Sequence, residues 1–180
     1  TVIGLLYEQI GDNAKAEQNY RRAAQLMPKS GNENNNYAAF LCKLGKYDEA
    51  DKYFQVAVAD PFYKTPAVAL TNAGTCAIKG GNFVAAERDL RSALEYAPNN
   101  SEALFQMATV LYRKQEFFKA RAFFQRYESV GRQSADALLL GRNIELQLGN
   151  GKAASDHTQR LRSQFPDSEQ SRSLDTPSSS

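Results

Sequence analysis

The side chains that most often do chemistry in proteins are few in this chain, and their spacing argues against a catalytic site. The chain has one histidine, two cysteines and no tryptophan, so it has little material for a zinc site or a Cys–His nucleophile pair. The histidine, His157, directly follows Asp156. Adjacent residues on a helix point in different directions, so these two cannot form an orienting dyad. We interpret His157 as a solvated or partly packed residue.

A glycine-rich stretch, Gly149-Asn150-Gly151-Lys152, invites comparison with a phosphate-binding loop. Such a loop needs Gly, four residues and then Gly-Lys-Ser/Thr, whereas Ala153 follows the lysine here. We interpret the stretch as a turn between helices. With no paired acid and base and no metal cluster in the sequence, we expect a protein that is not an enzyme and has no cofactor and no metal.

The overall composition excludes several other classes of protein. With 42% hydrophobic and 23% charged residues among 180, the chain is typical of a soluble globular protein. Its net charge of +2 gives no electrostatic basis for nucleic-acid binding. No apolar run approaches the roughly 18–20 residues needed to span a bilayer. The first residues lack the basic region and cleavage site of a signal peptide.

An internal repeat predicts the elements that would position any site. A frame of Gly, Ala, an apolar residue, a second Ala and Pro recurs with separations of 34, 36, 34 and 34 residues between its key alanines. This period is typical of the tetratricopeptide repeat, in which small residues let two antiparallel helices approach closely. We predict an all-α tetratricopeptide-repeat superhelix of about five helix pairs, truncated at the N-terminus. The key alanines are Ala16, Ala50, Ala86, Ala120 and Ala154.

The repeat array is expected over residues 1–167, and a polar tail, disordered or forming a short frayed helix, over 168–180. The predicted repeats are 1–30, 31–65, 66–100, 101–134 and 135–167. The first helix of each pair is expected at 1–10, 34–44, 67–79, 102–114 and 135–148. The second is expected at 13–27, 47–59, 83–97, 117–130 and 151–165.

The two cysteines, Cys42 and Cys76, fall late in the first helices of the second and third repeats. First helices of neighbouring repeats stack side by side, so a disulfide between them is geometrically possible. Two buried free thiols fit the same positions equally well, because small helix-packing sites accept cysteine readily. The residues alone leave these two alternatives open.

The inner faces of the first helices are the usual binding surface of such an array. Three amides, Asn36, Asn72 and Gln106, occupy the same repeat position and could hydrogen-bond the backbone of an extended peptide. A solvated polar face is an equally good interpretation. The complete set of protein-binding candidates is Asn35, Asn36, Lys43, Asn72, Thr75, Lys79, Gln106, Tyr112 and Arg113.

Three stretches carry a more specific resemblance: Asn34–Cys42, Asp60–Pro66 and Ala137–Arg142, with Arg160–Pro166 closing the last repeat. Together they resemble the type IV pilus biogenesis/stability lipoproteins, the PilF/PilW pilotin family of Gram-negative bacteria. The resemblance implies an outer-membrane lipoprotein on the periplasmic face, attached to the membrane through an N-terminal lipid anchor absent from this chain.

The resemblance also implies a partner and a function. The expected partner is the type IV pilus secretin, and possible further partners are other pilus assembly proteins. The expected function is to promote the outer-membrane localisation and multimerisation of that secretin. Because the periplasm is oxidising, the resemblance favours a Cys42–Cys76 disulfide. The alternative function is a general periplasmic tetratricopeptide adaptor in cell-envelope assembly.

A two-residue insertion lengthens the second repeat within Asp60–Pro66. Its prolines, Pro61 and Pro66, should stiffen the loop. We expect Phe62 and Tyr63 to pack against the array rather than to meet a partner.

Overall fold

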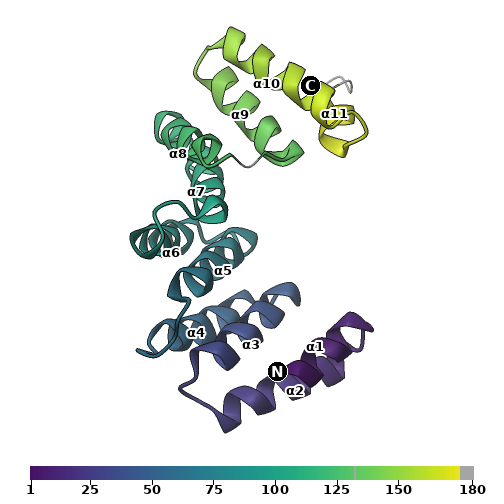
Figure 1. Cartoon of the computed structure of the whole chain (residues 1–180), viewed down its shortest axis with the longest axis vertical. Coiled ribbons are helices and arrows are strands. Elements are labelled where there is room, and N and C mark those ends of the chain that lie inside the picture. Colours follow the sequence, from purple (N-terminus) through teal and green to yellow (C-terminus); the bar gives the residue numbers. More distant parts are fainter. Residues whose placement is uncertain (132, 175–180) are drawn as a thin grey trace. The chain divides into compact units, whose positions relative to one another are not determined.

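The computed structural model describes residues 1–131 and 133–174. In this part of the chain every regular element is a helix, and successive helices form antiparallel pairs joined by short turns (Figure 1). The all-α prediction is therefore confirmed. The chain divides into two compact units, Thr1–Asn100 and Ser101–Ser180, and each is described by itself.

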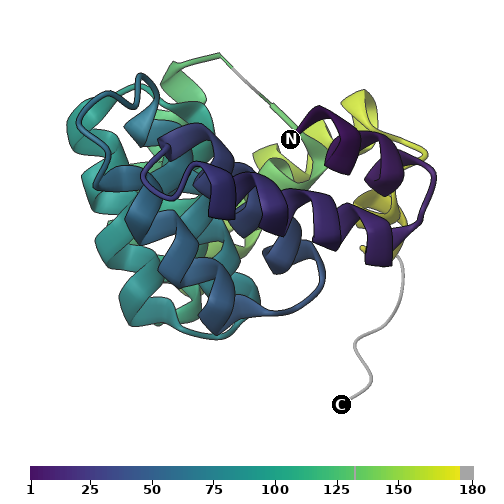
Figure 2. The same cartoon turned by 90° about the horizontal axis from the view of Figure 1, so that it is seen from below.

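The N-terminal unit contains three helix pairs, seen from below in Figure 2. The C-terminal unit contains two pairs and one short further helix. The helices of the N-terminal unit are α1 (Val2–Gln9), α2 (Asn13–Leu26), α3 (Gly31–Lys43), α4 (Tyr47–Val58), α5 (Pro66–Lys79) and α6 (Phe83–Tyr96). Those of the C-terminal unit are α7 (Ser101–Arg113), α8 (Phe117–Ser129), α9 (Ala135–Gln147), α10 (Gly151–Gln164) and α11 (Glu169–Ser173).

The start of α3 differs from the sequence prediction, which placed it at residue 34. The helix begins at Gly31, and the backbone N–H of this first residue has an acceptor in a distant side chain. The Gly31 N–H donates to Oδ2 of Asp60, at 2.8 Å, and the Ser30 hydroxyl donates to the Glu33 carboxylate. A carboxylate at this end of a helix also interacts favourably with the helix dipole. The acceptor Asp60 is 29 residues away in sequence, so a local pattern did not reveal it.

The turn inside each helix pair contains one residue with a positive φ. Four of these residues are glycines, but in the α7–α8 turn the position is taken by Gln115, with φ of 61°. A residue with a side chain is strained in this left-handed conformation. The five positions, separated by the repeat period, are Gly11, Gly45, Gly81, Gln115 and Gly149.

The residue after this turn caps the second helix of the pair. In three pairs its side chain accepts a hydrogen bond from the backbone N–H three residues later, which satisfies a donor that the helix cannot. The capping residues are Asp12, Asn82 and Asn150. Turn and cap together explain why the predicted starts of the second helices agree closely with the structure.

The core of each pair is built from small residues that oppose larger ones. The key alanines of the repeat are all buried. At Gly74 the two helices approach so closely that an added Cβ atom would lie 2.5 Å from Cγ of Leu90, a side chain with no exposed surface. The predicted role of small residues in close helix packing is therefore seen directly.

The loop of the insertion departs from expectation at one of its two aromatic residues. Tyr63 packs as predicted: it is 9% exposed, and its ring lies against Gly31. The expectation for Phe62 was wrong, because its side chain is 88% exposed. Phe62 lies in a turn that the Tyr63 N–H closes on the Asp60 carbonyl oxygen, at 3.1 Å, and its side chain projects from that turn into solvent.

The polar tail contains one short helix, α11, at Glu169–Ser173. Its Ser171 hydroxyl is buried and donates to the carbonyl oxygens of Leu161 and Phe165. The rest of the tail that was expected to be disordered, residues 175–180, lies outside the described residues.

Candidate functional site: the inner faces of the first-of-pair helices

Two helices of the N-terminal unit, α3 and α5, bring the predicted amides together. Asn72 on α5 donates through Nδ2 to Oδ1 of Asn35 on α3, at 3.2 Å. Asn35 is 8% exposed, so this bond lies mostly out of water. The neighbouring Asn36 is half-buried, and no described residue forms a hydrogen bond with its side chain. The sequence placed Asn36 and Asn72 at one repeat position, but the direct pair in the structure is Asn35 with Asn72.

Two further candidates lie on the same side of α5. The Thr75 hydroxyl donates to the carbonyl oxygen of Thr71, at 2.9 Å, a local bond that leaves its oxygen lone pairs available as acceptors. Lys79, in the last turn, is exposed, and no described residue forms an ion pair with it. Together with Asn36 and Asn72, these groups offer an incoming peptide both donors and acceptors.

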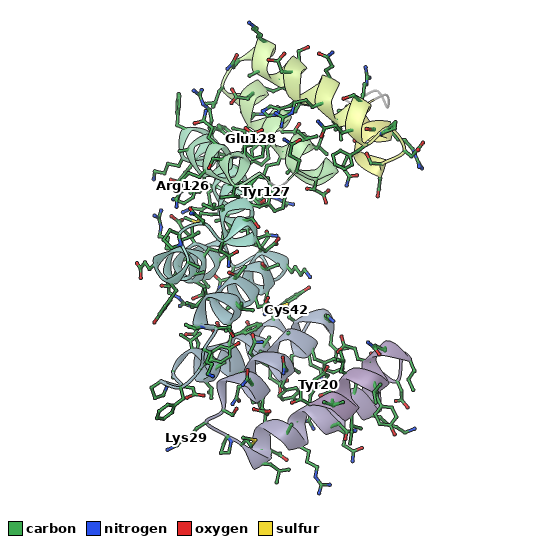
Figure 3. The ribbon with its side chains drawn as sticks, in the orientation of Figure 1. Tyr20, Lys29, Cys42, Arg126, Tyr127 and Glu128 are labelled. Atoms are coloured by element: carbon green, nitrogen blue, oxygen red, sulfur yellow. A yellow bond between two sulfur atoms is a disulfide. The ribbon has the colours of Figure 1, made fainter. Side chains whose placement is uncertain are left out.

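Lys43 is engaged within the protein. Its ammonium group pairs with the Glu8 carboxylate, which also accepts a hydrogen bond from the Tyr20 hydroxyl at 2.8 Å. This network joins α3 to α1 and α2, and Figure 3 shows Tyr20 on α2 facing the neighbouring helices. Burial raises the pKa of the Tyr20 phenol, and the hydrogen bond to Glu8 adds to that increase. Any binding role of Lys43 therefore competes with this internal ion pair.

The C-terminal unit contains the remaining candidates, all on α7. Gln106 donates through Nε2 to Glu102 one turn earlier, at 2.8 Å. The half-buried Tyr112 ring lies 5.6 Å from the Phe117 ring, centroid to centroid. Arg113 is exposed at the end of the helix, without an ion pair to any described residue. These side chains offer an amide, an aromatic surface and a cation to a ligand.

The two cysteines lie side by side near the C-terminal ends of α3 and α5. Their Cα atoms are 5.7 Å apart, a separation that suits a disulfide, and Figure 3 shows Cys42 where α3 faces α5. Cys76 is 2% exposed. A disulfide between Cys42 and Cys76 would therefore link α3 and α5, the two helices that carry Asn35 and Asn72.

His157 lies among α8, α9 and α10. It is 8% exposed, its ring meets the Phe124 ring edge-on with centroids 5.5 Å apart, and its Nδ1 has no hydrogen-bond partner among the described residues. Burial lowers the pKa of this imidazole. Of the two sequence interpretations the packed one is correct. A hollow of about 280 Å³ beside it is lined by charged side chains already joined in the pairs Arg121–Glu145 and Arg160–Glu128.

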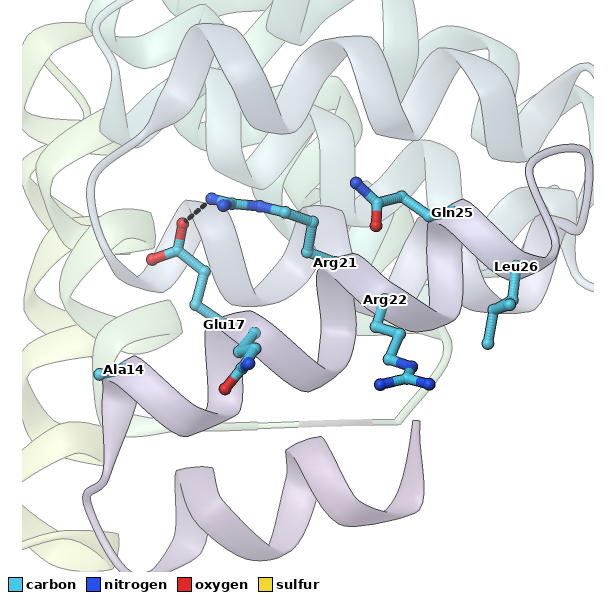
Figure 4. A pocket seen from close by; sticks show the side chains of 7 residues that line it. Ala14, Glu17, Arg21, Arg22, Gln25 and Leu26 are labelled. Carbon is cyan, nitrogen blue, oxygen red and sulfur yellow. Dashed lines mark hydrogen bonds and ion pairs between the residues drawn. The ribbon is translucent and has the colours of Figure 1, made fainter.

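A second hollow, of about 510 Å³, runs along the surface of α2 (Figure 4). Every residue that lines it belongs to this one helix, and Glu17 and Arg21 form an ion pair across it. Sequence analysis did not single out this surface. A hollow on one helix face lacks the opposing wall that a binding cleft needs.

The described residues hold no group of three or more His, Cys, Asp or Glu side chains placed to bind a metal ion. Residues 1–131 and 133–174 also include no helix that is both long and apolar enough to cross a membrane. The chemistry available on the inner faces is hydrogen bonding and ion pairing.

Comparison with known proteins matches this architecture. Models of the tetratricopeptide repeat match residues 1–30 and 77–144. The type IV pilus assembly protein PilF of Pseudomonas aeruginosa is 25% identical over 153 residues, which cover 85% of this chain and 61% of PilF. The chain therefore spans less than two thirds of that relative. An uncharacterised protein of Haemophilus influenzae is 34% identical over 71 residues, 39% of this chain and 40% of its own.

Solved structures give the same assignment. The crystal structure of PilW, described as a widely conserved type IV pilus biogenesis factor, superposes with a TM-score of 0.89 at 36% identity, over 97% of this chain and 80% of PilW. The structure of Pseudomonas aeruginosa PilF superposes with a TM-score of 0.83 at 22% identity, over 96% of this chain and 78% of PilF, which supports the fold. The repeat, the fold and the 36% identity to PilW agree. The chain belongs to the family of tetratricopeptide-repeat proteins that includes the type IV pilus biogenesis factor PilW.

Proposed function

We propose that this protein is a pilotin: a binding protein that helps the type IV pilus secretin reach the outer membrane and form its multimer. The observation that carries the proposal is the 36% identity to PilW over 97% of the chain. A family member of this kind acts by binding, and the inner faces supply groups suited to a peptide. The secretin is the partner that the family resemblance implies, and other pilus assembly proteins are further candidates.

The proposed recognition uses the inner faces of α3 and α5. Asn72 is oriented by its bond to Asn35, so a part of the side-chain entropy cost of binding is already met. Asn36 then offers a donor and an acceptor to the backbone of an extended segment. Lys79 gives a positive charge at the end of α5, where an acidic residue of the segment would find a partner.

The proposed location is the periplasmic face of the outer membrane, with attachment through a lipid anchor at the N-terminus of the full-length protein. One or two acyl chains provide such attachment without a membrane-spanning helix. We also propose that the Cys42–Cys76 pair is oxidised there, since disulfides persist in the periplasm. The bond would fix α3 against α5 and so hold the two amide-bearing helices in place.

The experiment is a pull-down of purified secretin by the lipid-free protein, together with secretin multimers scored on a denaturing gel from a deletion strain. Binding and loss of heat-stable multimers on deletion are expected. Asn36→Ala should weaken the pull-down several-fold, because the hydrogen bonds between the Asn36 side-chain amide and the backbone of the bound segment are lost. Gln159→Ala, at an exposed amide on α10, is the matched control and should bind normally.

Normal multimers in the deletion strain, with no binding, would reject the pilotin proposal. The tetratricopeptide array would then be assigned to another client, as a general periplasmic adaptor in cell-envelope assembly. If deletion removes the multimers but Asn36→Ala binds as well as the unaltered protein, the function would stand and the inner-face site would be wrong.

A further inference from the structure

The loop between α4 and α5, residues 59–65, holds one aromatic side chain out in solvent. Tyr63 anchors the loop against Gly31, and Asp60 holds it to the start of α3. The Tyr63 N–H also donates to the Asp60 carbonyl oxygen, at 3.1 Å, which closes a tight turn. The residue before Tyr63, Phe62, lies within this turn, and its side chain is 88% exposed. An aromatic side chain held outward by a rigid loop loses little conformational entropy when a partner covers it.

Phe62 forms one wall of an apolar hollow of about 600 Å³ in the N-terminal unit. Val56 on α4 and Pro61 contribute further apolar surface, and Val56 is itself 38% exposed. Two separate segments line the hollow, since Lys29 comes from the turn between α2 and α3, where Figure 3 labels it. Residues distant in sequence therefore meet at this hollow, in contrast to the one-helix hollow on α2.

Lys29 and Asp60 both line this hollow, and Lys64 lies beside it on the loop, so lysines outnumber carboxylates here by two to one. Both carboxylate oxygens of Asp60 are already hydrogen-bonded to backbone, Oδ2 to the Gly31 N–H and Oδ1 to the Phe62 N–H at 2.9 Å. Lys29, in contrast, is exposed and forms no ion pair with a described residue. Lys64 is exposed two residues after Phe62 and is likewise without an ion pair to the described residues. A carboxylate seated here would gain the ammonium groups of these lysines, whereas a cationic group would find only Asp60, whose two oxygens already accept backbone hydrogen bonds.

We propose that this hollow is a second docking site, which takes a partner protein segment with an aliphatic or aromatic side chain next to an acidic residue. The apolar side chain packs between Phe62 and Val56, and the carboxylate pairs with Lys29. Large aromatic residues are frequent anchors of protein interfaces, and an adjacent charge pair sets orientation. This site lies on the α4–α5 loop rather than on the inner faces, so it does not depend on the proposed function.

The test uses three short capped peptides: one alternating Leu and Asp, one alternating Leu and Lys, and one alternating Ser and Asp. Each is titrated into the isotope-labelled full chain and followed by amide NMR shifts. The Leu-Asp peptide should shift the amides of Lys29, Val56 and Phe62. Phe62→Ala should weaken its binding about tenfold or more, the usual effect of truncating an interface anchor. Lys29→Glu should weaken it and strengthen binding of the Leu-Lys peptide.

The matched control is Phe118→Ala, which removes a phenylalanine with 78% exposure on α8 and should leave Leu-Asp binding unchanged. Equal binding of all three peptides, or equal loss in both phenylalanine variants, would overturn the proposal. Self-association in sedimentation velocity that Phe62→Ala abolishes would reassign the surface to a second copy of this chain. Binding to anionic vesicles that requires Phe62, without peptide binding, would reassign it to a lipid surface.

Discussion

Reduction of the Cys42–Cys76 pair should destabilise the N-terminal unit and leave the C-terminal unit unchanged. A disulfide removes conformational entropy from the unfolded chain, and the loss grows with the length of the loop that it closes. The two cysteines are 34 residues apart. For a loop of this length the chain-entropy relation gives about 3.8 kcal/mol at 25 °C. That is a large share of the stability of a typical domain.

Hydrogen exchange followed by mass spectrometry is the appropriate assay, because it reports each unit separately. Peptides from α3 and α5, compared with and without a phosphine reductant, should lose protection roughly 600-fold if they exchange through unfolding of the unit, the factor that corresponds to about 3.8 kcal/mol. Peptides from α7 to α10 serve as an internal control. A Cys42→Ala/Cys76→Ala variant should match the reduced protein and no longer respond to the reductant.

Three results would refute the reasoning. Unchanged protection in α3 and α5 on reduction would mean that the two thiols do not constrain the unfolded chain. An equal loss of protection in α7 to α10 would mean that the disulfide stabilises both units and not only the N-terminal one. A thiol titration that finds both cysteines free in periplasmic material would contradict the proposed oxidation.

Three smaller perturbations test the packing. Gln115→Gly should raise the free energy of unfolding by about 0.5–1 kcal/mol in thermal melts, because glycine adopts the positive φ without strain, and Gln115→Ala should give no gain. Gly74→Ala should lower it by about 1 kcal/mol or more, since the clash with Leu90 exceeds the gain in helix propensity, whereas Gly151→Ala, with open space around it, should be neutral or stabilising. His157 has a lowered pKa in the folded state, so the unfolded chain takes up its proton first, and stability should fall as pH drops below about 6.5. A His157→Gln variant should lose less stability than the unaltered protein between about pH 7 and pH 5, and an equal loss in both would contradict this account.

The helix pairs were predictable from sequence because their determinants are local. A residue with positive φ, a cap and a buried alanine recur at the repeat period, as at Gly81, Asn82 and Ala86. Each determinant acts within a few residues along the chain, so pattern alone places it. The one glycine position taken by Gln115 did not disturb the fold, because the helices on both sides fix that turn.

The features that sequence did not reveal depend on contacts between distant residues. The start of α3 is set by Asp60, and the exposure of Phe62 follows from the turn that Asp60 closes and that Tyr63 anchors over Gly31. At the candidate site, a repeat register gives the helix face but not the angle at which two helices cross. The register aligned Asn36 with Asn72, but the crossing of α3 and α5 pairs Asn72 with Asn35.

The loop at 59–65 also decides where this protein can be divided into modules. Asp60 and Tyr63 belong to the same repeat as Gly31, so residues 31–65 contain both the start of a helix and the groups that close it. A copy of residues 31–65 moved into another repeat array would carry with it both the acceptor for the Gly31 N–H and the Tyr63 ring that covers Gly31. A copy ended at Val58 would leave the Gly31 N–H without its acceptor and Gly31 without the Tyr63 ring that covers it. The natural seam for recombining these repeats therefore lies just before Pro66, after the loop rather than at the end of a helix.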